Sequence, residues 1–154
     1  MLICNDEPDL ILLTETIPKA QRLPMTPALF HITGYSLYTN FVPSTPNLGR
    51  SGTRGICVYV AQHLKVSEVS LEASAVEHVW VKLSLKGSDC LLIGCIYRSP
   101  SSQPGESVTQ LRHLFEQASV LSSHLVIVGD FNFPQIDWEA EASSAPTVTV
   151  PIPS

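Results

Sequence analysis

The sequence predicts an α/β domain of the α+β class, in which short strands outnumber helices. Short apolar runs bounded by Pro, Gly or other turn formers recur along the chain in the pattern of buried strands. A single strong helix signal begins near Ser107, where apolar residues follow helical spacing. The 154 residues are 44% hydrophobic and 15% charged, which favours one globular domain with a substantial core.

The first apolar run, Leu10–Leu13, follows turn-forming residues and predicts a buried strand. The carboxylate of Glu15 comes just beyond the carboxyl end of this strand. Residues 17–34 contain several prolines, which exclude a long helix. Tyr35–Tyr38 then predicts a short strand.

A loop rich in Gly and Pro spans residues 41–55 and carries Arg50 and Arg54. Loops of this length inside compact domains are usually functional or disordered. Its two arginines are the strongest local basic feature of the chain. The loop leads into Ile56–Val60, an apolar run that predicts another strand.

Val79–Leu85 and Cys90–Arg98 predict a β-hairpin. Apolar residues alternate in the first segment, with Lys82 on the other face, so we expect a strand buried on one face only. The polar turn Lys86–Asp89 joins the two segments, which should therefore pair antiparallel. The preceding residues Val66–Leu71 have no clear pattern.

An amphipathic helix is expected after a loop at residues 99–106. Ser107 is the predicted N-cap, because its hydroxyl can accept a backbone N–H of the first turn. Apolar positions three and four residues apart form one face of this helix: Val108, Leu111, Leu114, Phe115, Ala118 and Leu121.

The most distinctive stretch of the chain is residues 126–138. Val126–Val128 is β-branched at every position, which predicts a strand buried on both faces. Asp130 and Asn132 follow two residues apart, so in an extended backbone both side chains project from one face. A carboxylate beside an amide at the carboxyl end of a buried strand is a common way to hold a divalent metal or a phosphate.

The net charge of −5 and a pI of about 5.4 give no sequence-wide basic field that would draw the chain to nucleic acid. The four cysteines lack paired metal spacing, and Cys57 and Cys95 lie inside apolar runs, so we expect reduced core thiols. No apolar run is long enough for a membrane span, and the start lacks a secretion signal. We expect an intracellular protein, nuclear or cytoplasmic and not secreted.

Polar groups thus follow three predicted strands, and such strand ends commonly converge on one rim of a sheet to build a site. The ordered set of segments resembles the endonuclease/exonuclease/phosphatase superfamily, and more closely the apurinic-endonuclease-like domain of non-LTR (LINE-type) retrotransposon polyproteins. The segments that carry the resemblance are Pro8–Thr16, Arg54–Val60, Val79–Val81, Ile93–Pro100, Gly129–Pro134 and Ile136–Trp138.

The resemblance implies a four-layer α/β sandwich, with two mixed, mostly antiparallel sheets flanked by helices, and a phosphodiesterase site that uses Mg²⁺ or Mn²⁺. It implies that Glu15 binds the metal and Tyr97 contacts the scissile phosphate. Asp130 would orient the attacking water or serve the leaving group, and Asn132 would hydrogen-bond the phosphate. Hard cations prefer such oxygen ligands. The implied partner is DNA, with a reverse transcriptase domain downstream in an intact relative.

Simpler readings stand beside these roles. Glu15 alone would be a surface carboxylate at a strand end, and Asp130 with Asn132 alone would form an Asx-type turn. Three arginines are candidate substrate contacts, but each also has a structural reading. Arg50 and Arg54 would then be solvated loop charges, and Arg98 an ion-pair partner of Glu15 or Asp130. Tyr97 alone would be an amphipathic edge residue, Trp138 beside Asp137 a packing anchor, and the histidines without a role.

The sequence also departs from the family pattern. Family domains begin with one more strand that bears an asparagine and end in a Ser-Asp-His motif, whereas this chain contains no Asp-His dipeptide. That histidine with its carboxylate partner is the family's general base or phosphate-polarising pair. We therefore expect residues 1–138 to form an incomplete domain with little or no catalysis, and residues 139–154 to be a poorly ordered tail. The alternative is a non-catalytic remnant or protein-interaction module.

Overall fold

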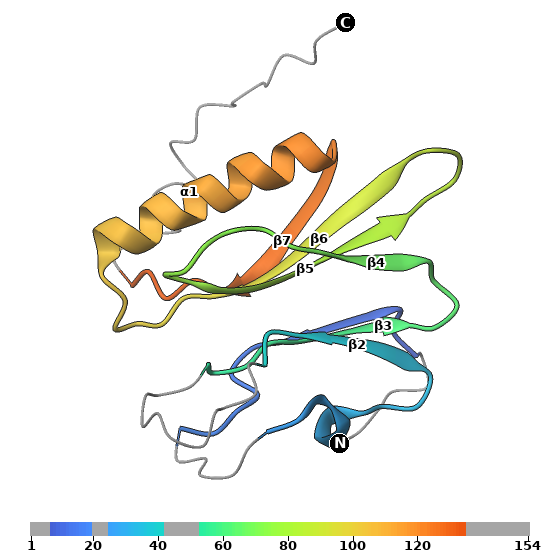
Figure 1. Cartoon of the computed structure of the whole chain (residues 1–154), viewed down its shortest axis with the longest axis horizontal. Helices are drawn as coiled ribbons and strands as arrows, with labels where there is room; N and C mark the ends of the chain where they lie inside the picture. The colour runs from blue at the N-terminus through green and yellow to red at the C-terminus, as the bar shows by residue number, and fades with distance from the viewer. Residues whose placement is uncertain (1–6, 20–24, 42–52, 135–154) are drawn as a thin grey trace, which may run out of the picture.

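The computed structural model describes residues 7–19, 25–41 and 53–134. It contains two β-sheets that pack face to face, with one α-helix on the outer face of one sheet (Figure 1). This arrangement confirms the predicted α/β class with mostly antiparallel sheets. The predictions for Arg50, Asp137, Trp138 and the tail at 139–154 lie outside the described residues.

Sheet A contains β1 (Leu10–Leu13), β2 (Tyr35–Thr39) and β3 (Cys57–Ala61) in the order β1-β3-β2, with both pairs antiparallel. The central strand β3 is buried at every position, as expected for an apolar run with a neighbour on each side. The 3-10 helix η1 (Pro27–Phe30) lies on the outer side of this sheet, where the backbone carbonyl of Phe30 accepts a hydrogen bond from the Tyr59 hydroxyl at 2.8 Å (Figure 1).

Sheet B contains β4 (Val66–Val69), β5 (Glu77–Ser84), β6 (Cys90–Tyr97) and β7 (His124–Asp130) in that order. β5 and β6 form the predicted antiparallel hairpin. The helix α1 (Pro104–Leu121) connects β6 to β7, and these two strands pair in parallel. The segment at 66–71, which had no clear pattern, forms the short strand β4 against β5.

The prediction that β5 is buried on one face only is wrong. Val79 and Val81 face the core between the two sheets, and Trp80 on the opposite face is 1% exposed because α1 covers it. Trp80 pairs with Gly94 across the hairpin, and a side chain at Gly94 would overlap the Trp80 ring. The glycine in β6 therefore provides the space for this large core residue.

The helix begins earlier than predicted. It starts at Pro104, which suits the first turn because its missing N–H would have no helical partner there. Ser107 is therefore not the cap but a fully buried residue inside the helix, and its hydroxyl donates to the carbonyl oxygens of Gln103 and Pro104. Leu111, Leu114 and Ala118 of the predicted apolar face are buried, whereas Val108, Phe115 and Leu121 are exposed.

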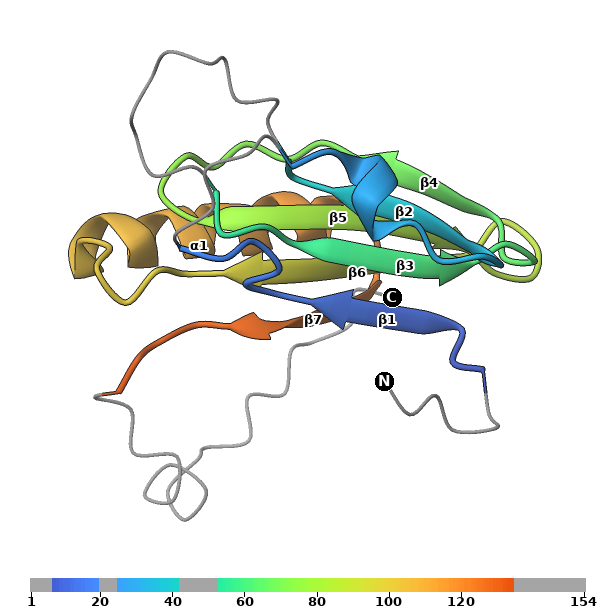
Figure 2. The same ribbon diagram turned by 90° about the horizontal axis from the view of Figure 1, so that it is seen from below.

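The prediction that Val126–Val128 is buried on both faces is also wrong. Leu125 and Ile127 pack against the cluster under α1, but Val126 is 45% exposed and Val128 37% exposed. The reason is the position of β7 at the edge of sheet B, where β6 is its only paired neighbour among the described strands. β1, an edge strand of sheet A, lies at the same side of the molecule (Figure 2).

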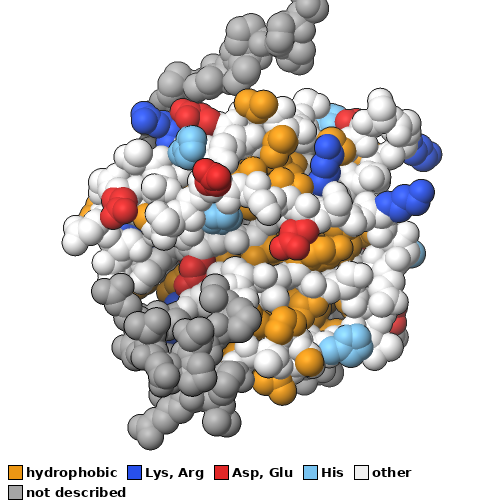
Figure 3. Space-filling model, viewed as in Figure 1, with side chains coloured by type: hydrophobic (Ala, Val, Ile, Leu, Met, Phe, Trp, Pro, Cys, Tyr) orange, Lys and Arg blue, Asp and Glu red, His pale blue; other side chains and the backbone are white. Residues whose placement is uncertain are grey.

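Cys57 and Cys95 are free, buried thiols, as the apolar context predicted. Burial raises the pKa of both thiols, that of Cys95 to about 11, so both stay protonated at neutral pH. No helix in the described part of the chain is long and apolar enough to cross a membrane. On the face seen in Figure 3, the described lysines and arginines are separated by other side chains and form no continuous basic patch.

Candidate functional site

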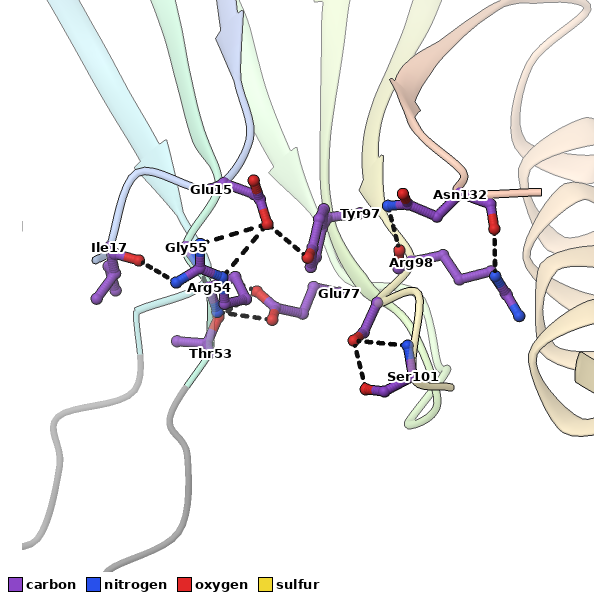
Figure 4. A network of polar contacts seen from close by, with 11 residues as sticks. Glu15, Ile17, Thr53, Arg54, Gly55, Glu77, Tyr97, Arg98, Ser101 and Asn132 are labelled. Atoms are coloured by element: carbon purple, nitrogen blue, oxygen red, sulfur yellow. Dashed lines mark hydrogen bonds and ion pairs between the residues drawn. The ribbon is translucent and has the colours of Figure 1, made fainter. Parts of the chain in front are cut away.

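A hydrogen bond between Glu15 and Tyr97 links the two packed sheets. Glu15 lies just beyond β1, and Tyr97 ends β6. The Tyr97 hydroxyl donates to Glu15 Oε1 at 2.7 Å across 82 positions of sequence (Figure 4). The carboxyl ends of these two strands therefore share one rim, as the sequence predicted. Asp130 is the register partner of Tyr97 on β7, which brings the third strand end to the same rim.

One of the two carboxylate oxygens of Glu15 accepts hydrogen bonds from other residues, and the other accepts none from the described side chains. Oε1 accepts the Tyr97 hydroxyl and, at 3.4 and 3.3 Å, Nε and Nη2 of Arg54. No described side chain donates to Oε2, and the Glu15 side chain is 42% exposed. The hydrogen bond from Tyr97 and the neighbouring Arg54 lower the pKa of Glu15, so the carboxylate is ionised at neutral pH. Burial, followed by the bond to Glu15, raises the pKa of Tyr97, which keeps its hydroxyl proton.

Arg54 is part of the site and is not a solvated loop charge. Its side chain is 20% exposed, and its Nη1 donates to the backbone carbonyl of Ile17 at 2.7 Å. All three guanidinium nitrogens thus contact the turn that carries Glu15. The structure uses this arginine to hold a carboxylate in place.

Asp130 and Asn132 form the Asx-type turn that was the simpler reading. The Asn132 N–H donates to Asp130 Oδ1 at 3.3 Å. The amide of Asn132 donates from Nδ2 to the carbonyl oxygen of Arg98 at 2.8 Å. Asn132 is therefore fixed beside the end of β6, one residue beyond Tyr97 (Figure 4).

Arg98 has a structural role, but its partners differ from the expected ones. It is 3% exposed, and Nε donates to the Ser107 hydroxyl at 2.7 Å. Nη1 and Nη2 donate to the carbonyl oxygens of Asn132 and Ser102 at 2.7 and 3.2 Å. Its guanidinium also lies 4.2 Å from the ring centre of Phe133. Arg98 forms no ion pair with Glu15 or Asp130, because neutral acceptors on α1 and the adjoining turns take its donors.

Two of the site residues have an unusual backbone conformation. Glu15 has a φ of 54° and Asn132 a φ of 49°, and they are the two non-glycine residues with positive φ in the described part of the chain. Such conformations cost about 1–3 kcal/mol and cluster at functional sites. Both follow strand ends on the rim, which supports the assignment of this rim as the site.

Sequence reasoning missed Glu77 and Asn40. Glu77 Oε1 accepts the backbone N–H of Arg54 at 2.7 Å, and Oε2 accepts Asn40 Nδ2 at 2.8 Å. A partial signal was available: counting back from the predicted turn Lys86–Asp89 places Glu77 opposite Arg98, one residue from Tyr97, its partner in the structure. The role of Asn40 has no such signal, because it depends on the approach of sheet A.

The donor set fits a cation that needs few protein ligands. The described residues contain no group of three or more His, Cys, Asp or Glu side chains arranged to hold a metal. Glu15 offers one ionised carboxylate oxygen at an exposed rim. Mg²⁺ commonly keeps several waters and is bound by one or two carboxylates together with substrate phosphates. These residues fit Mg²⁺ better than a metal that requires a full protein cage.

Three histidine–carboxylate pairs lie among the described residues, and one of them, His113 with Glu116 at 4.0 Å, is exposed on α1. The other two lie away from the rim. His63 contacts Asp9 at 3.1 Å, and His124 contacts Asp89 at 3.0 Å. His63 follows the carboxyl end of the antiparallel strand β3, and His124 begins β7, so both pairs lie at the opposite ends of the sheets. Neither pair can serve as a general base at the rim.

One family model matches most of the chain. The model of the endonuclease/exonuclease/phosphatase family matches residues 5–148. No curated protein sequence matches the chain. Among solved structures, the human Nocturnin catalytic domain with a bound sulfate anion is 18% identical, with a TM-score of 0.47, and the match covers 90% of this chain. The chain spans 56% of the length of that domain.

Proposed function

The chain belongs to the endonuclease/exonuclease/phosphatase family, and from this we propose that its rim site binds the phosphodiester backbone of DNA together with Mg²⁺. The contact between Glu15 and Tyr97 carries the proposal, because it places an ionised carboxylate beside a neutral hydroxyl donor at the joined strand ends. Origin from a LINE-type retrotransposon polyprotein belongs to the same proposal and rests on the order of the sequence segments. A reverse transcriptase domain downstream in the same polyprotein would support it.

Glu15 is the proposed cation ligand, through the oxygen that receives no donor from the described side chains. A bound Mg²⁺ supplies positive charge that polarises a phosphoryl oxygen. Mn²⁺ can take the same oxygen ligands. The low pKa of Glu15 favours this role, because only the ionised carboxylate binds a cation at neutral pH.

Tyr97, Asn132 and Asp130 are the proposed phosphate-side groups. The Tyr97 hydroxyl keeps its single proton at neutral pH and would donate it to a phosphate oxygen in place of Glu15 Oε1. The side-chain amide of Asn132 has two N–H donors, and one of them donates to the Arg98 carbonyl. Asp130 uses Oδ1 within its turn, and its second carboxylate oxygen can orient a water.

Binding without efficient cleavage is the expected behaviour of these 154 residues. The sequence contains no Asp-His dipeptide. Two histidine–carboxylate pairs lie at the other ends of the sheets, and the third, His113 with Glu116, is exposed on α1. Phosphodiester hydrolysis gains about 10²- to 10⁴-fold from a positioned general base. We therefore propose that the chain holds the cation and the phosphate but turns over little substrate.

Replacing Tyr97 with Phe should weaken Mg²⁺-dependent binding of duplex DNA at least about 10-fold, the low end of the range for one hydrogen bond to a charged group. Fluorescence anisotropy of a labelled duplex at fixed ionic strength measures this, because salt alone changes DNA affinity. Tyr35→Phe is the matched control. Tyr35 lies on β2, and its hydroxyl donates to the Pro8 carbonyl at 2.7 Å, so this variant also loses one tyrosine hydrogen bond. Equal affinity for both variants, or binding independent of Mg²⁺, would contradict the proposal.

A second candidate function is a non-catalytic interaction module. The exposed apolar side chains Leu13, Val126 and Val128 on edge strands favour it, because such edges recruit partners. The acidic net charge favours it as well. Robust Mg²⁺-dependent nicking of supercoiled plasmid by the 154-residue chain would exclude this candidate and would also show that a general base is present.

A further inference from the structure

Glu77, at the start of β5 and opposite Tyr97, is the centre of a hydrogen-bond cluster at the rim. Its Oε1 accepts the N–H of Arg54 at 2.7 Å, and its Oε2 accepts the N–H of Gly55 at 3.1 Å (Figure 4). Oε2 also accepts Asn40 Nδ2 at 2.8 Å. Asn40 Oδ1 in turn accepts the N–H of Ile56 at 2.8 Å. Two side chains thereby take the backbone N–H groups of three consecutive residues, 54–56.

This segment carries Arg54 to the cation ligand. The Arg54 guanidinium donates from Nε and Nη2 to Glu15 Oε1, and from Nη1 to the Ile17 carbonyl. The Ile17 N–H donates back to the Arg54 carbonyl at 2.9 Å. The position of Arg54 therefore sets the position of the turn that follows β1.

We propose that Glu77 is a positioning residue of the cation site: by fixing the backbone of Arg54, it holds Glu15 Oε1 against Arg54 and leaves Oε2 to bind the cation. This inference rests on the proposed function of Glu15. The position requires a carboxylate, because every partner of Glu77 among the described residues is a donor, and an ionised carboxylate is an acceptor at both oxygens.

Glu77→Gln tests the proposal, because its amide NH₂ must face one of these donors and leave it without an acceptor. The Arg54 Nε–H should exchange with water at least about tenfold faster in NMR spectra, since its bond to Glu15 loosens. Mn²⁺ should bind about tenfold more weakly, the low end of the range for groups that hold a metal ligand. The Arg98 Nε–H is the internal control and should not change, because it is buried against Ser107.

Glu68→Gln is the matched control variant, because Glu68 is an exposed carboxylate on β4; it should leave both readouts unchanged. Thr53→Val is a milder test if Glu77→Gln folds poorly, since it removes one donor to Glu77 and keeps the charge. It should shift both readouts in the same direction by less. Wild-type exchange of Arg54 in either folded variant would overturn the proposal. If the wild-type protein binds no Mn²⁺ but Arg54 still exchanges faster in Glu77→Gln, the role of Glu77 in fixing Arg54 is supported and the proposed function is overturned.

Discussion

Glu15→Gln should reduce Mn²⁺ affinity by at least about 100-fold. Loss of a group that merely supports a metal ligand costs about 10- to 100-fold, and this substitution removes the charged ligand itself. Glutamine keeps the size of the side chain but can no longer ionise. Isothermal titration calorimetry with Mn²⁺ at neutral pH measures the change.

The fold should survive this substitution, because Glu15 is exposed and lies beyond the end of β1. Its contacts with Tyr97 and Arg54 lie at the rim, outside the two apolar clusters that form the core. A circular dichroism melt should therefore resemble that of the wild type. Mn²⁺ binding of wild-type strength in folded Glu15→Gln would show that another group holds the cation.

Gly129→Ala should destabilise the fold by about 3 kcal/mol or more. Gly129 has a φ of 155° and pairs with Ile96, so a methyl group there would lie 2.8 Å from the carbonyl carbon of Ile96 and closer still to its oxygen. Backbone atoms cannot move aside as a flexible side chain can. Forcing extra volume into a packed position costs about 1–3 kcal/mol, and separating β6 from β7 adds the loss of their paired hydrogen bonds.

Chemical denaturation monitored by tryptophan fluorescence measures this change, because Trp80 is buried under α1. Gly105→Ala is the matched control: nothing lies within 4 Å of the added carbon, and the residue is in the first turn of α1. Alanine there should be neutral or stabilise by up to about 1 kcal/mol. An unfolding midpoint of Gly129→Ala equal to that of the wild type would refute the close approach of the two strands.

The sequence allowed prediction of those parts of the fold that depend on local pattern. The hairpin of β5 and β6 followed from two apolar runs joined by a polar turn. Its register is one residue from the one that a turn at Lys86–Asp89 implies, because Ser84 pairs with Cys90. The approach of Glu15 to Tyr97 followed from strand ends that carry polar groups. Both predictions needed only the order of strands and turns.

Features that depend on tertiary neighbours were not predictable in this way. The apolar run at 126–128 has the composition of a central strand, yet β7 has one neighbour, and composition does not report strand order. Trp80 is buried because α1 packs over the face of β5 that was predicted, from Lys82, to be exposed to solvent. Arg98 and Glu77 have their roles because distant turns bring acceptors and donors to them.

Mapping of the Mn²⁺ site by NMR is the most direct test of a cation-dependent phosphate site at this rim. Substoichiometric Mn²⁺ broadens the amide signals of nearby residues in ¹⁵N-labelled protein. The signals of Thr14, Glu15, Tyr97 and Arg98 should disappear first, and Glu15→Gln should abolish the effect. Broadening centred instead on the exposed pair of Asp89 and His124, at the opposite end of β7, would contradict the assignment of the site.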